Sequence, residues 1–270
     1  MTGPAGERER LIVALAREVA PDDSVVVGVG TPLALAAVLL ARELHAPAVR
    51  LLMPGALDPA ARDLADYLVR PWSGGGSARA RLSRMDILDA IAAGAVTLQF
   101  VRPAQVDERL RINTELVRSP RGIRHLVGPV ALPDLLERAG RVVAYLPRHD
   151  PASLVPEVDT VTAPRPGGRG RLARVITPLA VLERPGDSTL VTGRGTSVSA
   201  AELAELTGFP VAQDGARPIP EPSAEELDLL RRVVDPLGLS GLEDPVGRTA
   251  ALGTLARAWK TSPSFREAAP

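Results

Sequence analysis

The chain has 270 residues, of which 45% are hydrophobic but only 3% aromatic, so a large core has to be built from Ala, Val and Leu. Its 32 basic and 32 acidic residues give a formal net charge of zero, which argues against nucleic acid or an anionic membrane surface as the main partner. The absence of cysteine excludes disulfides, thiolate nucleophiles and Cys-ligated metals. We expect a cytoplasmic protein, because the charged N-terminus is no signal peptide and no apolar run is long enough to span a bilayer.

The first elements follow a strand–helix–strand order. Apolar residues at helical spacing predict a helix over residues 7–20 that ends at Pro21. A β-branched strand over 24–29 leads through a glycine turn into a helix over 32–44, which has proline in its permissive first turn. A second strand is predicted over 48–53. Because one crossover helix joins the two strands, we expect them to pair in parallel.

The rest of the chain is predicted to be richer in strands. We expect glycine-rich loops at 73–77 and 165–170, helices at 84–94, 199–207 and 223–238, and an extended linker at 216–222. Further strands are predicted at 95–101, 111–117, 140–146, 158–164 and 172–183. This order indicates an α/β protein with an open, mostly parallel sheet and flanking helices. We expect a single domain over 1–240 and a weakly structured tail over 241–270.

The turn "GVGTP" lies between the first strand and its helix, with Gly28 and Gly30 near its centre. Backbone N–H groups at such a turn can bind an anion, helped by the helix dipole. The turn lacks the Lys-Ser/Thr of a phosphate-binding P-loop and the third glycine of a dinucleotide fingerprint. The alternative interpretation is a tight turn that only allows close packing.

A second group of polar residues lies in "PAQVDERLRINTELV", namely Gln105, Asp107, Asn113 and Thr114. They could form a polar cluster at one edge of the sheet, where α/β proteins bind ligands. They could equally belong to a hairpin in which Asp and Asn side chains cap backbone groups. Both interpretations stay open at this stage.

Other common catalytic signatures are missing from the sequence. His45, His125 and His149 show no metal-binding spacing, and we expect them to be surface or capping residues, with "HDP" at 149–151 forming a turn. We predict no metal site. No G-x-S-x-G elbow occurs, so a serine-hydrolase triad is unsupported.

Several ordered stretches between residues 10 and 239 resemble the β subunit of the family I CoA-transferases of the glutaconate and 3-oxoacid type. "VVVGVGTPLALAAVLLARELHAP" is similar to the family's first strand, glycine turn and first helix. The most specific match is Gln105-Val106-Asp107 with Ile112-Asn113-Thr114, which resembles the Gln-Val-Asp…Asn-Ile-Asn-Thr signature. "RVITPLAVLE", "AAELAELTGFPV" and "ELDLLRRVVDPLG" resemble later family segments. The resemblance implies the NagB/RpiA/CoA-transferase type of fold.

The resemblance also implies a substrate site, although its nucleophile is replaced. Family members place a catalytic glutamate just after the second strand, where a carboxylate attacks the acyl-CoA thioester and a glycine turn binds the oxyanion. Here that position falls on Met53 or Pro54, and Asp58 is shorter and lies further on. The implied substrate and oxyanion residues are Gly28, Gly30, Thr31, Pro54, Gly55, Gln105, Asp107 and Asn113.

Two glycine-containing family segments are changed as well. The glycine-rich loop that contacts CoA in the family corresponds to residues 128–134, so Gly128, Pro129 and Val130 are the implied CoA loop. Arg109-Leu110-Arg111 replaces the family's aromatic-Gly-Asn. A backbone that approaches a ligand closely usually requires glycine.

Three hypotheses follow from the resemblance. The first is a β-like subunit that acts on an acyl-CoA or related thioester, with the carboxylate supplied by an α-like partner in a hydrolase-type or atypical reaction. The second is a genuine CoA-transferase with another carboxylate, for which Glu115 is the candidate, since it follows Asn113 by two residues on the predicted strand. The third is a non-catalytic subunit or a binding module with a non-CoA ligand. We predict no tightly bound cofactor; coenzyme A thioester and a small carboxylate are the implied ligands.

Overall fold

The computed structural model describes residues 3–28, 30–53, 55–61, 63–69, 78–162 and 172–261. The chain divides into two compact units, where the sequence predicted one domain over 1–240. Unit 1 combines Met1–Asp89 with Pro222–Pro270, and unit 2 comprises Ala90–Glu221. The predicted glycine-rich loops at 73–77 and 165–170 lie outside the described residues.

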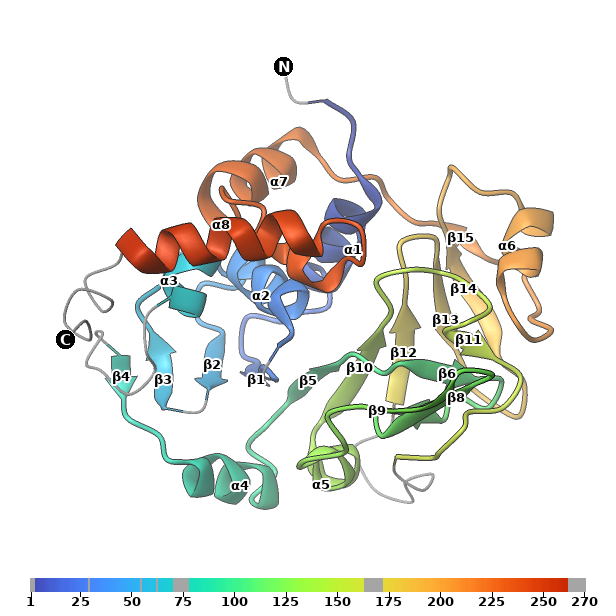
Figure 1. Ribbon diagram of the computed structural model, residues 1–270, viewed down its shortest axis with the longest axis horizontal. Coiled ribbons are helices and arrows are strands. Elements are labelled where there is room, and N and C mark those ends of the chain that lie inside the picture. The colour runs from blue at the N-terminus through green and yellow to red at the C-terminus, as the bar shows by residue number, and fades with distance from the viewer. Residues whose placement is uncertain are drawn as a thin grey trace. The chain divides into compact units, whose positions relative to one another are not determined.

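In the part that the structure describes, unit 1 contains four short strands and most of the helices (Figure 1). The strands are β1 (Ser24–Val26), β2 (Arg50–Met53), β3 (Ala56–Pro59) and β4 (Ala78–Ala80). β1 and β2 pair in parallel, as the sequence predicted, whereas β3 is antiparallel to both β2 and β4. The helices are α1 (Glu7–Ala16), α2 (Pro32–Leu44), α3 (Leu64–Val69), α7 (Ala224–Leu229), the π-helical turn η1 (Leu230–Val234), the 3-10 turn η2 (Leu239–Glu243) and α8 (Arg248–Thr261). The boundary with unit 2 falls within α4 (Arg84–Ala92).

Unit 2 is richer in strands and holds two sheets and a separate hairpin. In the main sheet, β5 (Leu98–Val101), β10 (Arg141–Tyr145) and β12 (Leu172–Ile176) are parallel. β13 (Ala180–Glu183) and β14 (Leu190–Arg194) continue it antiparallel, and β15 (Arg217–Pro218) pairs with β14. The small sheet contains β6 (Gln105–Asp107), β7 (Ile112–Asn113) and β11 (Leu154–Val155). The hairpin is β8 (Leu116–Ser119) with β9 (Gly122–His125), and two helices complete the unit, α5 (Leu132–Arg138) and α6 (Ala200–Leu206).

The α/β fold class is confirmed, but three predicted strands are wrong in detail. The predicted strand 111–117 is interrupted at residues 114–115, where the chain turns from β7 into β8. The predicted strand 172–183 is two antiparallel strands, because the Thr177 hydroxyl accepts hydrogen bonds from the N–H groups of Leu179 and Ala180 and closes a turn. Residues 158–162 form no strand, and the rest of that predicted strand lies outside the described residues.

The segment 241–270, predicted as a weakly structured tail, contains the end of η2 and the 14-residue helix α8. α8 packs on η2 and on α3 within unit 1. Ala251 of this helix is buried, whereas most of its other residues stay at least partly exposed. Among the described residues, no helix combines the length and apolarity needed to cross a membrane.

Helix α2 is the centre of the unit 1 core. Every residue from Pro32 to Ala41 is buried, and the helix packs against α1, η1 and η2. A helix that is apolar on all sides gains its stability by being surrounded, here by segments from both ends of the chain. In Figure 1, α1, α2, α7 and α8 lie together above β1, β2 and β3.

Two ion pairs join the beginning of the chain to its end. Arg17 pairs through two nitrogens with the Glu226 carboxylate at 2.8 and 3.0 Å, and Arg231 pairs in the same way with Glu9 at 2.6 and 2.8 Å. Two-point pairing of this kind fixes orientation as well as distance. It helps to explain why α1 and α7 share a unit although they are more than 200 residues apart.

Replacing Glu243 is expected to destabilise unit 1, because its carboxylate oxygen accepts a 2.7 Å hydrogen bond from the N–H of Leu33 in the first turn of α2. Glu243→Ala leaves this buried N–H unpaired and should lower the free energy of unfolding by about 1–3 kcal/mol in urea titrations. Glu243→Gln keeps an acceptor but removes the charge, and should cost about 1 kcal/mol. Glu225→Ala, at an exposed position of the same unit, is the control. Equal losses for Glu243→Ala and the control would contradict this role.

Candidate functional site

The predicted glycine turn lies in unit 1, between the end of β1 and the start of α2. Gly30 has a φ of +77°, a left-handed conformation that favours glycine. The Thr31 hydroxyl donates a 2.7 Å hydrogen bond to the carbonyl oxygen of Gly28 and closes the turn. The turn therefore has a defined shape that depends on Gly30 and Thr31.

The N-terminal end of α2 already carries a negative group. The side chain of Glu243 is only 3% exposed, and its carboxylate binds the N–H of Leu33. A carboxylate at this place offsets the positive end of the helix dipole. One N–H group of this helix start is thus already bonded within the chain.

The strand end where the resemblance places a glutamate carries an apolar side chain. Met53 is the last residue of β2 and is 2% exposed, and Pro54 lies outside the described residues. Gly55, with a φ of +105°, follows in the turn between β2 and β3. Its N–H donates to the carbonyl oxygen of Leu82 at 2.9 Å, so this group is engaged within the chain.

Asp58 is held in a structural role. Its Oδ1 accepts hydrogen bonds from the N–H of Leu51 at 2.7 Å and from the guanidinium of Arg42 at 3.3 Å. Its φ of +46° is unusual for a residue other than glycine. These contacts tie β3 to β2 and α2 through Oδ1 of Asp58.

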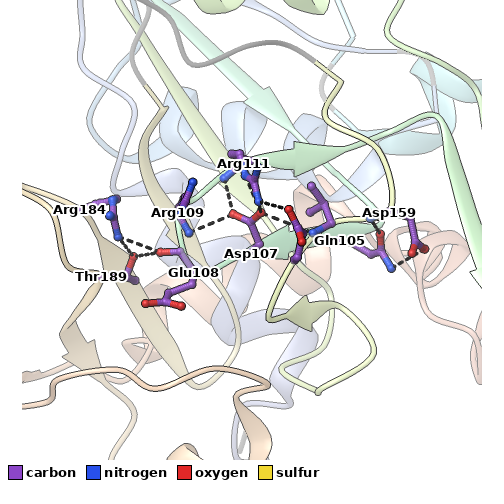
Figure 2. A network of polar contacts seen from close by, with 10 residues as sticks. Gln105, Asp107, Glu108, Arg109, Arg111, Asp159, Arg184 and Thr189 are labelled. Atoms are coloured by element: carbon purple, nitrogen blue, oxygen red, sulfur yellow. Dashed lines mark hydrogen bonds and ion pairs between the residues drawn. The ribbon is translucent and has the colours of Figure 1, made fainter.

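In unit 2, Asp107 anchors the turn between β6 and β7 (Figure 2). Its fully buried carboxylate accepts hydrogen bonds from the N–H groups of Arg109 and Arg111 at 2.9 and 3.0 Å. The Arg111 guanidinium donates to its second oxygen at 2.7 Å and also reaches Glu157 at 3.1 Å. These are the backbone-capping contacts of the hairpin interpretation.

Gln105 and Asn113 lie opposite each other on β6 and β7 and bond directly. Asn113 Nδ2 donates to Gln105 Oε1 at 2.7 Å and to the carbonyl oxygen of Leu116, while its Oδ1 accepts from the N–H groups of Glu115 and Leu116. Gln105 Nε2 donates to Asp159 Oδ2 at 3.0 Å. Both buried amides are thus engaged inside the protein, as buried polar groups generally are.

The same hairpin is tied to the main sheet of unit 2. The carbonyl oxygen of Glu108 accepts hydrogen bonds from the Thr189 hydroxyl at 2.5 Å and from the Arg184 guanidinium at 3.0 Å. Figure 2 shows this contact beside the Asp107 cluster. The Gln-Val-Asp and Asn-Thr residues therefore sit in a continuous, internally bonded network.

Glu115 lies in the turn between β7 and β8 and not on a strand with Asn113, so its predicted strand position is wrong. The strand ends because Asn113 Oδ1 accepts from the N–H groups of residues 115 and 116 and turns the backbone. The Glu115 side chain is partly buried. It belongs to unit 2, whereas Met53 and the glycine turn belong to unit 1.

His149 is buried, which contradicts the prediction of a surface or capping residue. The imidazole is 6% exposed, and its two nitrogens lie 2.9 Å from the hydroxyls of Thr177 and Thr207. Since the Thr207 hydroxyl donates to the carbonyl oxygen of Leu203, it accepts from the imidazole Nε2. Burial lowers the pKa of His149 to about 4, so the ring is neutral at pH 7. His149, Thr177 and Thr207 lie in three separate segments of the chain, so only the tertiary structure reveals this environment.

Other predicted groups show simple environments. His45 Nε2 lies 3.0 Å from the carbonyl oxygen of Val19. No cluster of three or more His, Asp or Glu side chains suited to a metal ion occurs in the part of the chain that the structure describes.

Comparison with solved structures decides the fold family, although no protein-family model and no curated protein matches the chain. The decarboxylase AibA/AibB superposes with a TM-score of 0.74 at 28% identity, covering 87% of this chain and 97% of that chain. Glutaconate coenzyme A-transferase from Acidaminococcus fermentans gives 0.72 at 18% identity, covering 86% and 95%. Rhodococcus jostii RHA1 IpdAB gives 0.71 at 19% identity, covering 88% and 98%. The chain has the family I CoA-transferase fold.

Within this CoA-transferase fold, two positions keep a glycine-like backbone without glycine. Leu110, at the glycine of the family's aromatic-Gly-Asn, has a φ of +53°, and Val130 in the implied CoA loop has a φ of +49°. The left-handed region costs an L-residue roughly 1–2 kcal/mol. The loop is held by Gly128, whose N–H donates to the carbonyl oxygen of Thr114 at 3.0 Å, and by Pro129, whose carbonyl oxygen accepts from Leu132. Leu110 and Val130 thus hold left-handed backbone conformations without being glycine.

Replacing Asp107 with Asn is expected to lower stability more than it lowers the activity of the folded protein. The change removes the charge that pairs with Arg111 inside a buried site, and should cost about 2–3 kcal/mol of unfolding free energy in urea titrations. Asp187→Asn, at an exposed position of the same unit, is the control. Unchanged stability with lost activity would instead favour a substrate-binding role for Asp107.

Stability is expected to fall as the pH drops from about 6.5 to about 4, because the unfolded chain protonates His149 near its ordinary pKa of 6.5 while the folded chain resists protonation until about 4. The unfolded state therefore binds more protons within this window, which is worth about 3 kcal/mol in total. Urea titrations at several pH values should show this slope in the native chain and lose it in His149→Gln. His125→Gln is the control, and an unchanged slope in His149→Gln would refute the assignment.

Proposed function

We propose that this chain is the β-like subunit of a heteromeric enzyme that acts on an acyl-CoA or related thioester, and that an α-like partner supplies the catalytic carboxylate. The observation that carries the proposal is the buried Met53 at the end of β2, where the resemblance places the nucleophilic glutamate. A thioether cannot take over the chemistry of a carboxylate nucleophile. The fold is retained while the expected nucleophile is replaced.

The carboxylates bonded to β2 and α2 are poor substitutes. Asp58 is held by the N–H of Leu51 and by Arg42, and Glu243 is buried against the N–H of Leu33. Freeing either group for attack on a thioester would leave a buried N–H donor unpaired. This supports a reactive carboxylate from another chain.

For thioester hydrolysis, the partner carboxylate would take a proton from water as the water oxygen bonds to the carbonyl carbon. The carbon–sulfur bond then breaks, the partner's carboxyl group returns its proton to the departing sulfur, and the products are a carboxylic acid and the thiol of CoA. We assign the turn of Gly28, Gly30 and Thr31 to the carbonyl oxygen, whose developing charge backbone N–H groups can stabilise. We assign Gln105, Asp107 and Asn113 to the shape of the hairpin, since their polar groups are engaged within unit 2.

The test is an assay of acyl-CoA thioesters with this chain alone, with an α-like CoA-transferase chain alone, and with the two chains co-expressed. We expect release of free thiol only from the complex. Changing the partner's active-site carboxylate to its amide should abolish release, whereas Glu115→Gln in this chain should leave it within about twofold. Thiol release by this chain alone would overturn the proposal.

The same assay separates the proposal from its alternatives. A covalent acyl adduct trapped on Glu115 by hydroxylamine, together with exchange of CoA between acids, would establish a genuine transferase. A complex that neither binds nor turns over any acyl-CoA would indicate a non-catalytic subunit or a non-CoA ligand.

Decarboxylation is a second candidate reaction. It is favoured by the similarity to the decarboxylase AibA/AibB, which at 28% identity exceeds the 18 and 19% found with the glutaconate enzyme and IpdAB. Release of carbon dioxide without free thiol from the co-expressed complex would support it. Release of thiol without carbon dioxide would exclude it for the thioesters tested.

A further inference from the structure

Among the described residues, no further strand pairs with the hairpin of β8 and β9. We call residues 116–125 the basic hairpin. None of its strand residues is buried, and all four residues of β9 are exposed. A two-stranded hairpin exposed in this way is marginally stable in water without further packing.

The base of the basic hairpin is nevertheless firmly fixed. The N–H of Leu126 donates to the carbonyl oxygen of Glu115 at 2.8 Å, and Asn113 Nδ2 donates to that of Leu116 at 2.6 Å. The N–H of Arg118 donates to Asp159 Oδ2 at 2.9 Å. A projecting element that is already ordered loses less entropy when it binds.

The basic hairpin is strongly positive in a chain whose net charge is zero. It contains Arg118, Arg121, Arg124 and His125 and no acidic residue. Among the described residues, none of the three guanidinium groups forms an ion pair. Asp159, the acidic residue bonded to this hairpin, accepts from the backbone N–H of Arg118 and not from its guanidinium. These charges are available to a negatively charged surface.

Exposed apolar side chains accompany this charge. Ile123 on β9 is 53% exposed, and Val127 and Val130, which follow the hairpin, are 85% and 81% exposed. Val130 also has a φ of +49°, which is a strained backbone conformation for a β-branched residue. Its side chain is therefore exposed and its backbone is strained. Apolar side chains mixed with Arg are typical of protein–protein contact surfaces.

The strand register separates a protein partner from a phosphate ligand. Arg118 lies opposite Ile123, and Arg124 lies opposite Val117, so the two arginines project from opposite faces of the hairpin. They are poorly placed to clamp one phosphate group together. A groove that encloses both faces would contact both arginines and Ile123.

We propose that the basic hairpin is a docking arm that inserts into an acidic, partly apolar groove of the α-like partner chain. This inference rests on the proposed function, which requires such a partner. Charge complementarity selects the acidic surface, and burial of Ile123 and Val127 supplies the apolar contact.

The experiment measures binding of this chain to the co-expressed α-like chain by calorimetry and by hydrogen exchange. The variant Arg118→Glu/Arg121→Glu/Arg124→Glu should raise the dissociation constant at least about tenfold at low salt, and less at 1 M salt. Ile123→Ser/Val127→Ser should weaken binding at both salt concentrations. The control Arg79→Glu/Arg81→Glu/Arg217→Glu changes three other exposed arginines and should leave binding unchanged. Amide exchange at 116–125 in the native chain should slow when the partner is added.

The outcomes separate this inference from the proposed function. If the native chain binds its partner and turns over substrate, but the hairpin variants bind equally well and exchange at 116–125 is unchanged, the docking arm is refuted and the proposed function stands. Intact complexes that lose acyl-CoA binding would make the hairpin a phosphate site and also refute docking. A native chain that binds no α-like partner refutes both. Circular dichroism of each variant confirms that the fold is kept.

Discussion

The start of helix α2 is the constraint on which unit 1 depends. α2 is buried along most of its length, so its first N–H groups cannot all turn to water and need acceptors from the protein. Glu243, from the other end of the chain, supplies one of these acceptors and a negative charge. Together with the ion pairs Arg17–Glu226 and Arg231–Glu9, this contact joins the C-terminal segment to the start of the unit.

Unit 2 shows how a family signature can be structural. The most specific motif in the sequence contains Gln105, Asp107 and Asn113. The polar atoms of each side chain form hydrogen bonds with neighbouring backbone or amide groups. Because buried polar groups have to be paired, a network of this kind tolerates little change. The motif therefore identifies the fold reliably even where the chemistry at the end of β2 has changed. Leu110 and Val130 make the same point, since both hold left-handed backbone conformations without being glycine.

The proposed function and the proposed docking arm fit one physical picture. A subunit that relies on another chain for its reactive carboxylate has to hold that chain in a fixed register. An ordered, positively charged hairpin can provide such a register, because its base is bonded into unit 2 while its tip stays exposed. The proposed thioester chemistry and the proposed docking surface thus place two demands on the same assembly.

The sequence by itself determined those helices and strands that follow from patterns of neighbouring residues. The β1–α2–β2 unit, the helix bounds of α2 and the buried strand β10 follow from hydrophobic period, proline position and β-branched runs. Only the tertiary structure decided the rest, because the relevant contacts join residues far apart in the chain. Glu243 reaches Leu33 across 210 positions, Thr177 and Thr207 enclose His149, and α8 is held by η2 and α3. Such contacts produce no periodic pattern in the sequence, because the burial and the hydrogen-bond partners of a residue depend on which other residues surround it in the folded protein.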